Sequence, residues 1–175
     1  LHFQYGFHAH HMVANALFAD GAAALVSVNE TQKREAPGII STQSQLFADS
    51  RDAMSWTVTD HGFAMTLSPR VPELIERGLR PWLEPWLETH GLSLQDIGGW
   101  AVHPGGPRVL DAVQASLGLP DQALAESRSV LREHGNMSSP TVLLILERLL
   151  KQADKRPCVA LAFGPGLAAE AALIG

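Results

Sequence analysis

The sequence predicts an α/β protein in which helices pack against a mainly buried sheet. Short apolar runs of strand length alternate with longer segments whose apolar residues recur every three or four positions, and turn residues separate the two. Hydrophobic residues make up 46% of the chain and charged residues 18%, which supplies a core and argues against intrinsic disorder. The length of 175 residues fits a single domain spanning residues 1–175.

The N-terminal third contains one predicted helix and three predicted strands. Residues 12–21 place apolar side chains at helical spacing before an Asp-Gly break, which predicts a short helix. Residues 22–28 are small and β-branched, which favours a buried strand. After a polar loop, the runs 39–47 and 54–59 predict two strands, which we expect to form a hairpin or sheet pair.

The rest of the chain alternates helices and strands. Residues 72–90 have the spacing of an amphipathic helix, with a kink possible near Pro81 and Pro85. The run 98–103 is short, apolar and flanked by breakers, which is typical of a buried strand. The other predicted elements are helices at 107–117, 121–134 and 138–151 and strands at 158–163 and 167–174.

Composition and charge exclude several classes of function. The formal net charge of −5 argues against a nucleic-acid or anionic-membrane surface, because such surfaces need clustered Lys and Arg. The single cysteine, Cys158, excludes an intrachain disulfide and fits a reducing compartment, so we expect a cytoplasmic protein. No stretch approaches the roughly 20 apolar residues of a membrane-spanning helix. The chain begins at Leu1 and not at a methionine, which is typical of a piece of a longer protein.

Three histidines near the N-terminus raise the question of a metal site. His8, His10 and His11 have a suitable spacing, but no acidic or cysteine partner is close in the sequence. We therefore expect no metal there, and interpret the cluster as a polar loop or the start of a helix.

A histidine ends the strand predicted at 98–103, directly before a turn with almost no side chains. His103 is followed by the sequence Pro-Gly-Gly-Pro, which presents the imidazole at the edge of the sheet, where ligands bind in open α/β structures. The alternative is a core histidine that precedes a tight turn.

A second candidate, Asn136, precedes the helix predicted at 138–151. It is either an N-terminal cap or an amide donor at the positive end of the helix. A neutral imidazole and an amide aimed at one point form an oxyanion hole, which would stabilise a thioester oxyanion or the enolate left when a malonyl thioester loses carbon dioxide. No nucleophile accompanies the pair, because Cys158 has apolar neighbours and no histidine near it in the sequence, and we interpret it as structural.

Four ordered motifs resemble the C-terminal half of the type III polyketide synthases, the chalcone and stilbene synthase family. They are LFADGAAA at 17–24, HPGGP at 103–107, GNMSS at 135–139 and FGPGL at 163–167. The related ketoacyl carrier-protein synthases share the histidine and asparagine, but their histidine turn typically lacks the Pro-Gly-Gly-Pro sequence, so a ketoacyl synthase III-like half is the second hypothesis.

The resemblance implies the C-terminal half of a thiolase-like fold, with a mixed sheet, two similar halves and an active site between them. A cysteine of the N-terminal half would be the acyl-accepting nucleophile, and His103 and Asn136 would be the catalytic residues for decarboxylating malonyl-CoA and condensing it with a CoA-linked starter. No metal or redox cofactor is implied, and a homodimer is expected. Without its N-terminal half the chain should be inactive; alternatively, it is a non-catalytic subunit that only dimerises or binds acyl-CoA.

Further residues match substrate-binding positions of the family. Met65 falls where plant members usually place a gatekeeper phenylalanine, although it could equally fill the core. The Gly164-Pro165-Gly166 sequence resembles the loop that shapes the cyclisation cavity, besides being a strand turn. Arg108, beside Gly105 and Gly106 of the glycine turn, could approach a phosphate of coenzyme A or remain a solvated surface residue.

Overall fold

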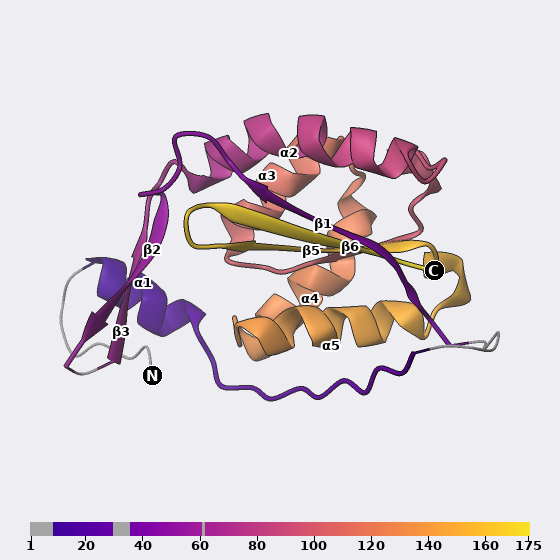
Figure 1. Cartoon of the computed structure of the whole chain (residues 1–175). Helices are drawn as coiled ribbons and strands as arrows, with labels where there is room; N and C mark the ends of the chain where they lie inside the picture. Colours follow the sequence, from indigo (N-terminus) through magenta and orange to yellow (C-terminus); the bar gives the residue numbers. More distant parts are fainter. Residues whose placement is uncertain (1–8, 30–35, 61) are drawn as a thin grey trace.

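A four-stranded sheet lies between two layers of helices (Figure 1). The computed structural model describes residues 9–29, 36–60 and 62–175. The helices of the two layers are α2 (Val71–Glu88) and α3 (Pro107–Leu117) on one face of the sheet, and α4 (Ala125–His134) and α5 (Ser139–Leu150) on the other. The predicted α/β layering is therefore confirmed, and none of the helices in the described part is long and apolar enough to span a membrane.

The sheet is mixed, with the strand order β1-β6-β5-β4. Its strands are β1 (Ile39–Leu46), β4 (Gly99–Val102), β5 (Cys158–Gly164) and β6 (Ala168–Ile174). β4 and β5 run parallel, whereas β6 is antiparallel to both of its neighbours. Because β4 and β5 are parallel, both run toward the same edge of the sheet, where β5 continues to Gly164 beyond Leu161, the partner of Val102.

The long helix α2 contributes much of the core on its face of the sheet. It buries a continuous stripe of apolar side chains at spacings of three and four: Val71, Leu74, Ile75, Leu79, Trp82, Leu83, Trp86 and Leu87. Each such burial stabilises the fold by about 1.5–3 kcal/mol. The helix continues through Pro81 and Pro85, whose exposed positions leave this stripe intact.

The strand predicted at 22–28 is wrong. These residues form an exposed, unpaired segment that runs below α5 in Figure 1, and Leu25 and Val26 are 69% and 89% exposed. Their composition favours a strand, but a strand also needs a neighbour for its backbone groups, and in the described part of the chain none lies beside them.

The predicted pairing of the strands at 39–47 and 54–59 is also wrong. Residues 54–59 form β2 (Met54–Thr59), but β2 pairs with the unpredicted strand β3 (Gly62–Leu67) in a separate hairpin, while β1 pairs with β6. The chain leaves β1 through a loop in which the buried Ser50 side chain donates to the carbonyl oxygens of Phe47 (2.7 Å) and Gly166 (3.0 Å). These bonds tie the loop to the β5–β6 turn and direct the chain away from β1.

Two helix boundaries differ from the prediction. α1 (Ala9–Leu17) ends before Phe18, whose backbone pairs with residue 136 in an isolated parallel bridge. The helix expected over 121–134 opens with a 3-10 turn at Asp121–Leu124 and becomes α-helical only at Ala125. The boundary of α3 agrees with the prediction, since Gly118 ends it in the left-handed conformation, with φ +65°.

Candidate active site

His103 directly follows β4, at the edge of the sheet where β4 and β5 both end. Its backbone N–H donates to the carbonyl oxygen of Leu161 at 2.7 Å, which extends the β4–β5 ladder by one residue. Its own carbonyl oxygen accepts from the N–H of Gly105 at 3.1 Å, which closes the glycine turn. The structure thus places the imidazole at the predicted edge of the sheet.

The environment of the His103 ring keeps it neutral. The ring is half-buried, and its Nδ1 atom is buried with no hydrogen-bond partner in the part of the chain that the structure describes. This burial lowers the pKa of His103 from 6.5 to about 4, because desolvation disfavours the charged form. A neutral imidazole keeps one N–H donor, which suits hydrogen bonding to a developing oxyanion.

Asn136 lies in the short connection between α4 and α5 and is 3% exposed. Its backbone N–H donates to the carbonyl oxygen of Leu17, and its carbonyl oxygen accepts from the N–H of Ala19, both at 2.9 Å. Its side-chain Oδ1 accepts from the N–H of Ser138 at 2.9 Å, which forms an Asx turn. The N-cap of α5 is Ser138, so Asn136 is not the cap of that helix and the first of its two alternatives is wrong. Since a backbone N–H can only donate, the atom that faces it is the amide oxygen, and the Nδ2 group can donate elsewhere.

Two glycine turns close on the same stretch, residues 17–19. A Cβ atom on Gly106 would lie 3.7 Å from the Leu17 side chain. A Cβ atom on Gly135, which has φ +72°, would lie 3.0 Å from the Ala19 Cβ atom and 3.2 Å from the Leu17 carbonyl oxygen. Leu17 therefore connects the turn after His103 with the turn that carries Asn136, a role that its sequence position did not indicate.

The hairpin β2–β3 contacts Phe18, the residue whose backbone pairs with Asn136, through the aromatic side chain of Trp56. Met65 of β3 stands directly opposite Trp56 of β2, so the two side chains share one face of the hairpin. The centroids of the Trp56 and Phe18 rings lie 6.2 Å apart, and the Phe18 backbone pairs with that of Asn136. The half-buried Met65 is thus linked to the candidate site through two aromatic residues that the sequence reasoning missed.

The Gly164-Pro165-Gly166 turn follows β5 at the edge of the sheet where His103 lies. It is the β5–β6 turn, as predicted, and its Gly166 N–H donates to the carbonyl oxygen of Met54 at 3.0 Å. Because Ser50 also donates to Gly166, the turn is fixed from the side of the β1–β2 loop.

Arg108 is exposed to solvent, and Cys158 is buried at the opposite end of β4 and β5 from His103. The Arg108 side chain is exposed in the first turn of α3, and it has no ion-pair partner among the described residues. Cys158 is fully buried at the start of β5, opposite Gly99, about 13 Å along the strands from the His103 end at ~3.3 Å per residue. Burial raises the pKa of the Cys158 thiol to about 11, which agrees with the structural interpretation.

The histidine cluster His8, His10 and His11 lies outside the residues whose side chains are described. Within the described part, no group of three His, Cys, Asp or Glu side chains could hold a metal ion.

Comparisons with known proteins agree with this architecture. The family model of chalcone and stilbene synthases, C-terminal domain, matches residues 38–175. The chain is 39% identical to a 1,3,6,8-tetrahydroxynaphthalene synthase of Streptomyces peucetius, over 93% of this chain and 45% of that protein. It is 35% identical to a 3,5-dihydroxyphenylacetyl-CoA synthase of Amycolatopsis orientalis, with coverages of 93% and 45%.

The fold is also found among solved structures. PKS-I of the brown alga Ectocarpus siliculosus superposes with a TM-score of 0.87 at 28% identity, covering 99% of this chain and 49% of that chain. The chain therefore has the architecture of one half of a thiolase-like fold, and it spans about half the length of these relatives. On the match of its residues 38–175 and the similarity to these synthases, the chain belongs to the chalcone and stilbene synthase family, the type III polyketide synthases.

Proposed function

We propose that this chain is the C-terminal half of an acyltransferase that decarboxylates malonyl-CoA and condenses it with a CoA-linked starter. The observation that carries the proposal is the pair of donors on turns that close on residues 17–19: the neutral imidazole of His103 and the Asn136 amide, whose oxygen is already occupied. One relative is named as a synthase of an acyl-CoA, which supports a CoA thioester as the substrate class.

In this proposal, His103 and Asn136 act on the oxygen where negative charge develops. Loss of carbon dioxide breaks the bond between the malonyl carboxylate and the α-carbon, and the electron pair moves onto the thioester oxygen as an enolate. The N–H groups of His103 and Asn136 donate to that oxygen. The α-carbon then attacks the carbonyl carbon of a starter acyl group held on a cysteine, a carbon–carbon bond forms, and the cysteine thiolate leaves. Loss of one such donor slows this kind of step by about 10²–10³.

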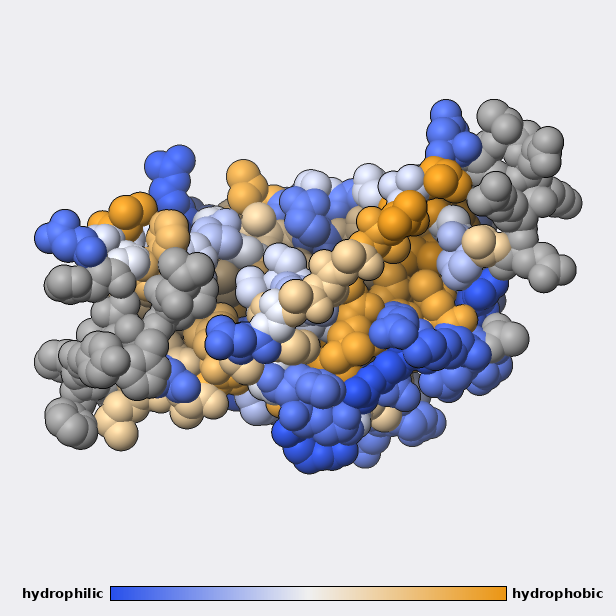
Figure 2. Space-filling model, turned by 90° about the horizontal axis from the view of Figure 1, so that it is seen from below, coloured by the Kyte–Doolittle hydropathy of each residue, from blue (hydrophilic) through white to orange (hydrophobic). Residues whose placement is uncertain are grey.

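The nucleophile of this reaction is proposed to come from an N-terminal half outside this chain. The buried Cys158, with a pKa raised to about 11, does not suit the role. An apolar groove of about 660 Å³ lies between the unpaired segment 22–25 and α5, and Figure 2 shows hydrophobic surface in this region of the molecule. The leucines of α5 that line it are Leu143, Leu144, Leu146 and Leu150. Such a surface fits a partner half that covers α5 and supplies strand contacts for 22–28.

Three further positions are proposed to shape substrate binding. Met65 would form a soft gate, because a thioether adapts its shape more easily than a phenyl ring does. The Gly164-Pro165-Gly166 turn would line the cavity beside His103. Arg108, with Gly105 and Gly106 behind it, would bind a phosphate of coenzyme A from the exposed first turn of α3. No metal or redox cofactor takes part in these steps.

The experiment joins this chain to its natural N-terminal half and measures malonyl-CoA decarboxylation. His103→Gln and Asn136→Leu should each lower kcat by about 10²–10³. The matched control is His90→Gln, an exposed histidine in the turn after α2 whose ring contacts only Trp86 among the described aromatic rings. Undiminished decarboxylation in the His103 and Asn136 variants would refute the assignment.

The isolated chain tests whether the nucleophile lies elsewhere, whereas decarboxylation by the joined protein separates this proposal from the non-catalytic alternative, which predicts none. Calorimetric titration with acyl-CoA, together with a thioester turnover assay, should show no turnover, whether or not the thioester binds. Turnover without the N-terminal half would contradict the proposal that the nucleophile lies elsewhere. The expected homodimer is tested separately by sedimentation of the joined protein.

A further inference from the structure

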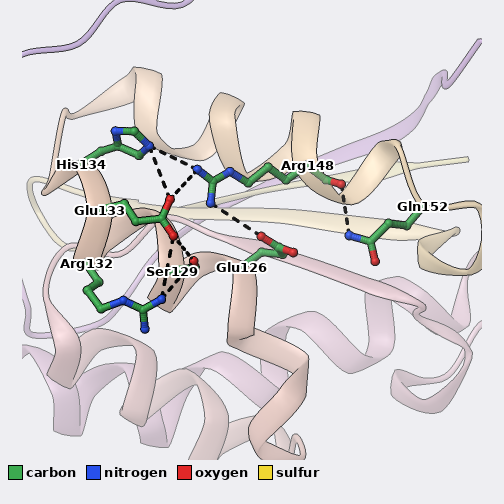
Figure 3. A network of polar contacts seen from close by, with 7 residues as sticks. All are labelled: Glu126, Ser129, Arg132, Glu133, His134, Arg148 and Gln152. Carbon is green, nitrogen blue, oxygen red and sulfur yellow. Dashed lines mark hydrogen bonds and ion pairs between the residues drawn. The ribbon is translucent and has the colours of Figure 1, made fainter.

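One arginine of α5 binds both ends of α4 (Figure 3). The Nη2 atom of Arg148 donates to Glu133 Oε2 at 2.9 Å, and it also lies 3.2 Å from His134 Nε2. Its Nη1 atom lies 3.9 Å from Glu126 Oε2. Glu126 belongs to the first turn of α4 and His134 is its last residue, so side chains from both ends of that helix reach one guanidinium group.

The partners of Arg148 are themselves held in place. Ser129 Oγ donates to Glu133 Oε1 at 2.5 Å, and this bond, followed by that from Arg148, keeps the pKa of Glu133 below its usual value. The contact between Arg148 Nη2 and His134 Nε2 is a hydrogen bond in the tautomer whose Nε2 accepts, because a guanidinium has no acceptor, and the same Nε2 atom lies 3.8 Å from Glu133 Oε2. The Gln152 side chain donates to the Arg148 carbonyl oxygen at 3.3 Å, which adds a contact at the end of α5 (Figure 3).

This network joins the end of α4, which directly precedes the connection that carries Asn136, to α5. His134 ends α4, Gly135 and Asn136 follow, and α5 begins at Ser139, so the orientation of α4 against α5 determines where the connection lies. On the α5 side, the N–H of Met137 donates to the buried Thr141 Oγ1 at 2.8 Å. Arg148 joins the two helices through hydrogen bonds and ion pairs with residues of α4. Among the described residues, its side chain makes no such bond with the connection itself.

We propose that Arg148 is a positioning residue for Asn136: by joining Glu133 and His134 to α5, it fixes the connection that aims the Asn136 amide. The inference rests on the proposed role of Asn136 in the oxyanion pair. In this proposal the ion network around Arg148 affects the rate of the chemical step, because it holds the end of α4 from which the Asn136 connection begins.

Hydrogen exchange on the chain itself tests the structural part. In Arg148→Gln, the backbone amides of Asn136 and Ala19 should exchange at least about threefold faster, because the helix ends that hold the connection open more often. The matched control is Arg80→Gln, which breaks a comparable ion pair with Glu84 (3.0 Å) on α2, away from the connection. Unchanged exchange at both amides would overturn the proposal.

Activity of the joined protein tests the functional part. Arg148→Gln should lower kcat for decarboxylation about tenfold with KM nearly unchanged, since a misdirected donor loses transition-state contact and not substrate binding. Arg148→Lys, which can restore one contact with Glu133, should recover part of kcat, and Arg80→Gln should leave it unchanged. Faster exchange with an unchanged kcat would overturn the positioning role. If Asn136→Leu itself retains full activity, the proposed function fails, and the exchange data still report on the network independently.

Discussion

Replacing Gly135 with alanine tests how tightly the connection that carries Asn136 is built. Gly135 has φ +72° and ψ −169°, a conformation that residues with a Cβ atom rarely adopt. The added methyl group would also meet the Ala19 Cβ atom at 3.0 Å and the Leu17 carbonyl oxygen at 3.2 Å. Backbone strain costs about 1–3 kcal/mol, and the steric overlap with fixed neighbours costs about a further 1–3 kcal/mol.

The expected loss in the free energy of unfolding is therefore about 2–6 kcal/mol, a large part of the roughly 5–15 kcal/mol typical of a domain. Urea unfolding followed by circular dichroism measures it. Gly118→Ala is the control, because Gly118 also has a positive φ (+65°) but no atom within 4 Å of the added methyl group, so it should lose only about 1–2 kcal/mol. The difference between the two variants contains the overlap with residues 17–19 and the extra strain of the Gly135 backbone, whose ψ is −169° and not the 36° of Gly118. Equal losses would refute the close approach on which the site geometry depends.

Three other predictions concern individual buried groups. For His103, the unfolded chain takes up a proton near pH 6.5 and the folded chain only near pH 4, so the wild type should lose about 2–3 kcal/mol relative to His103→Gln as pH falls from 7 to 4; a pH-independent difference would contradict the buried neutral ring. Cys158, buried and with a pKa raised to about 11, should resist iodoacetamide at neutral pH until denaturant is added, and rapid alkylation of the folded chain would contradict its burial. Ser50→Ala should lower the unfolding free energy by about 1–2 kcal/mol, because the carbonyl oxygens of Phe47 and Gly166 lose a donor; thermal denaturation checks this, and an unchanged Tm would count against the tie between the loop and the turn.

Local patterns predicted the elements that carry their own signal. The stripe from Val71 to Leu87 predicted α2, and the breakers around the apolar run that ends at His103 predicted β4, because burial follows helical and strand periodicity directly. The pairing of strands was harder to predict from local sequence patterns. The partner of β1 is β6, more than a hundred residues away, and the choice depends on a loop fixed by Ser50, whose hydroxyl bonds leave no trace in the apolar pattern.

The candidate site shows the same division. His103 and Asn136 could be chosen from the sequence because glycine turns next to a histidine and an asparagine are unusual enough to indicate chemistry. Leu17 and Phe18 were not chosen as site residues, since they stand at the end of an ordinary apolar helix and their contacts with residue 136 and Trp56 appear only in the folded chain. Arg148 was missed for a related reason: an arginine at helical spacing from other charges usually marks a solvated face, and only the packing of α5 on α4 shows what it holds.

Different interactions hold the two proposed donors, His103 and Asn136, in their working states, so a perturbation can affect one without the other. Desolvation at the end of β4 keeps the His103 ring uncharged, so its function should depend on what covers the edge of the sheet. Backbone bonds to residues 17–19, the bond to Ser138 and the Arg148 network hold Asn136, so its function should depend on the arrangement of α4 and α5. A partner half that binds to α5 and pairs with residues 22–28 would contact the helix that holds the Asn136 connection. It would therefore affect Asn136 more than His103. Assembly should therefore tighten the Asn136 connection, seen as slower amide exchange at Ala19 and Asn136, while the amide of His103, already bonded to Leu161, changes little.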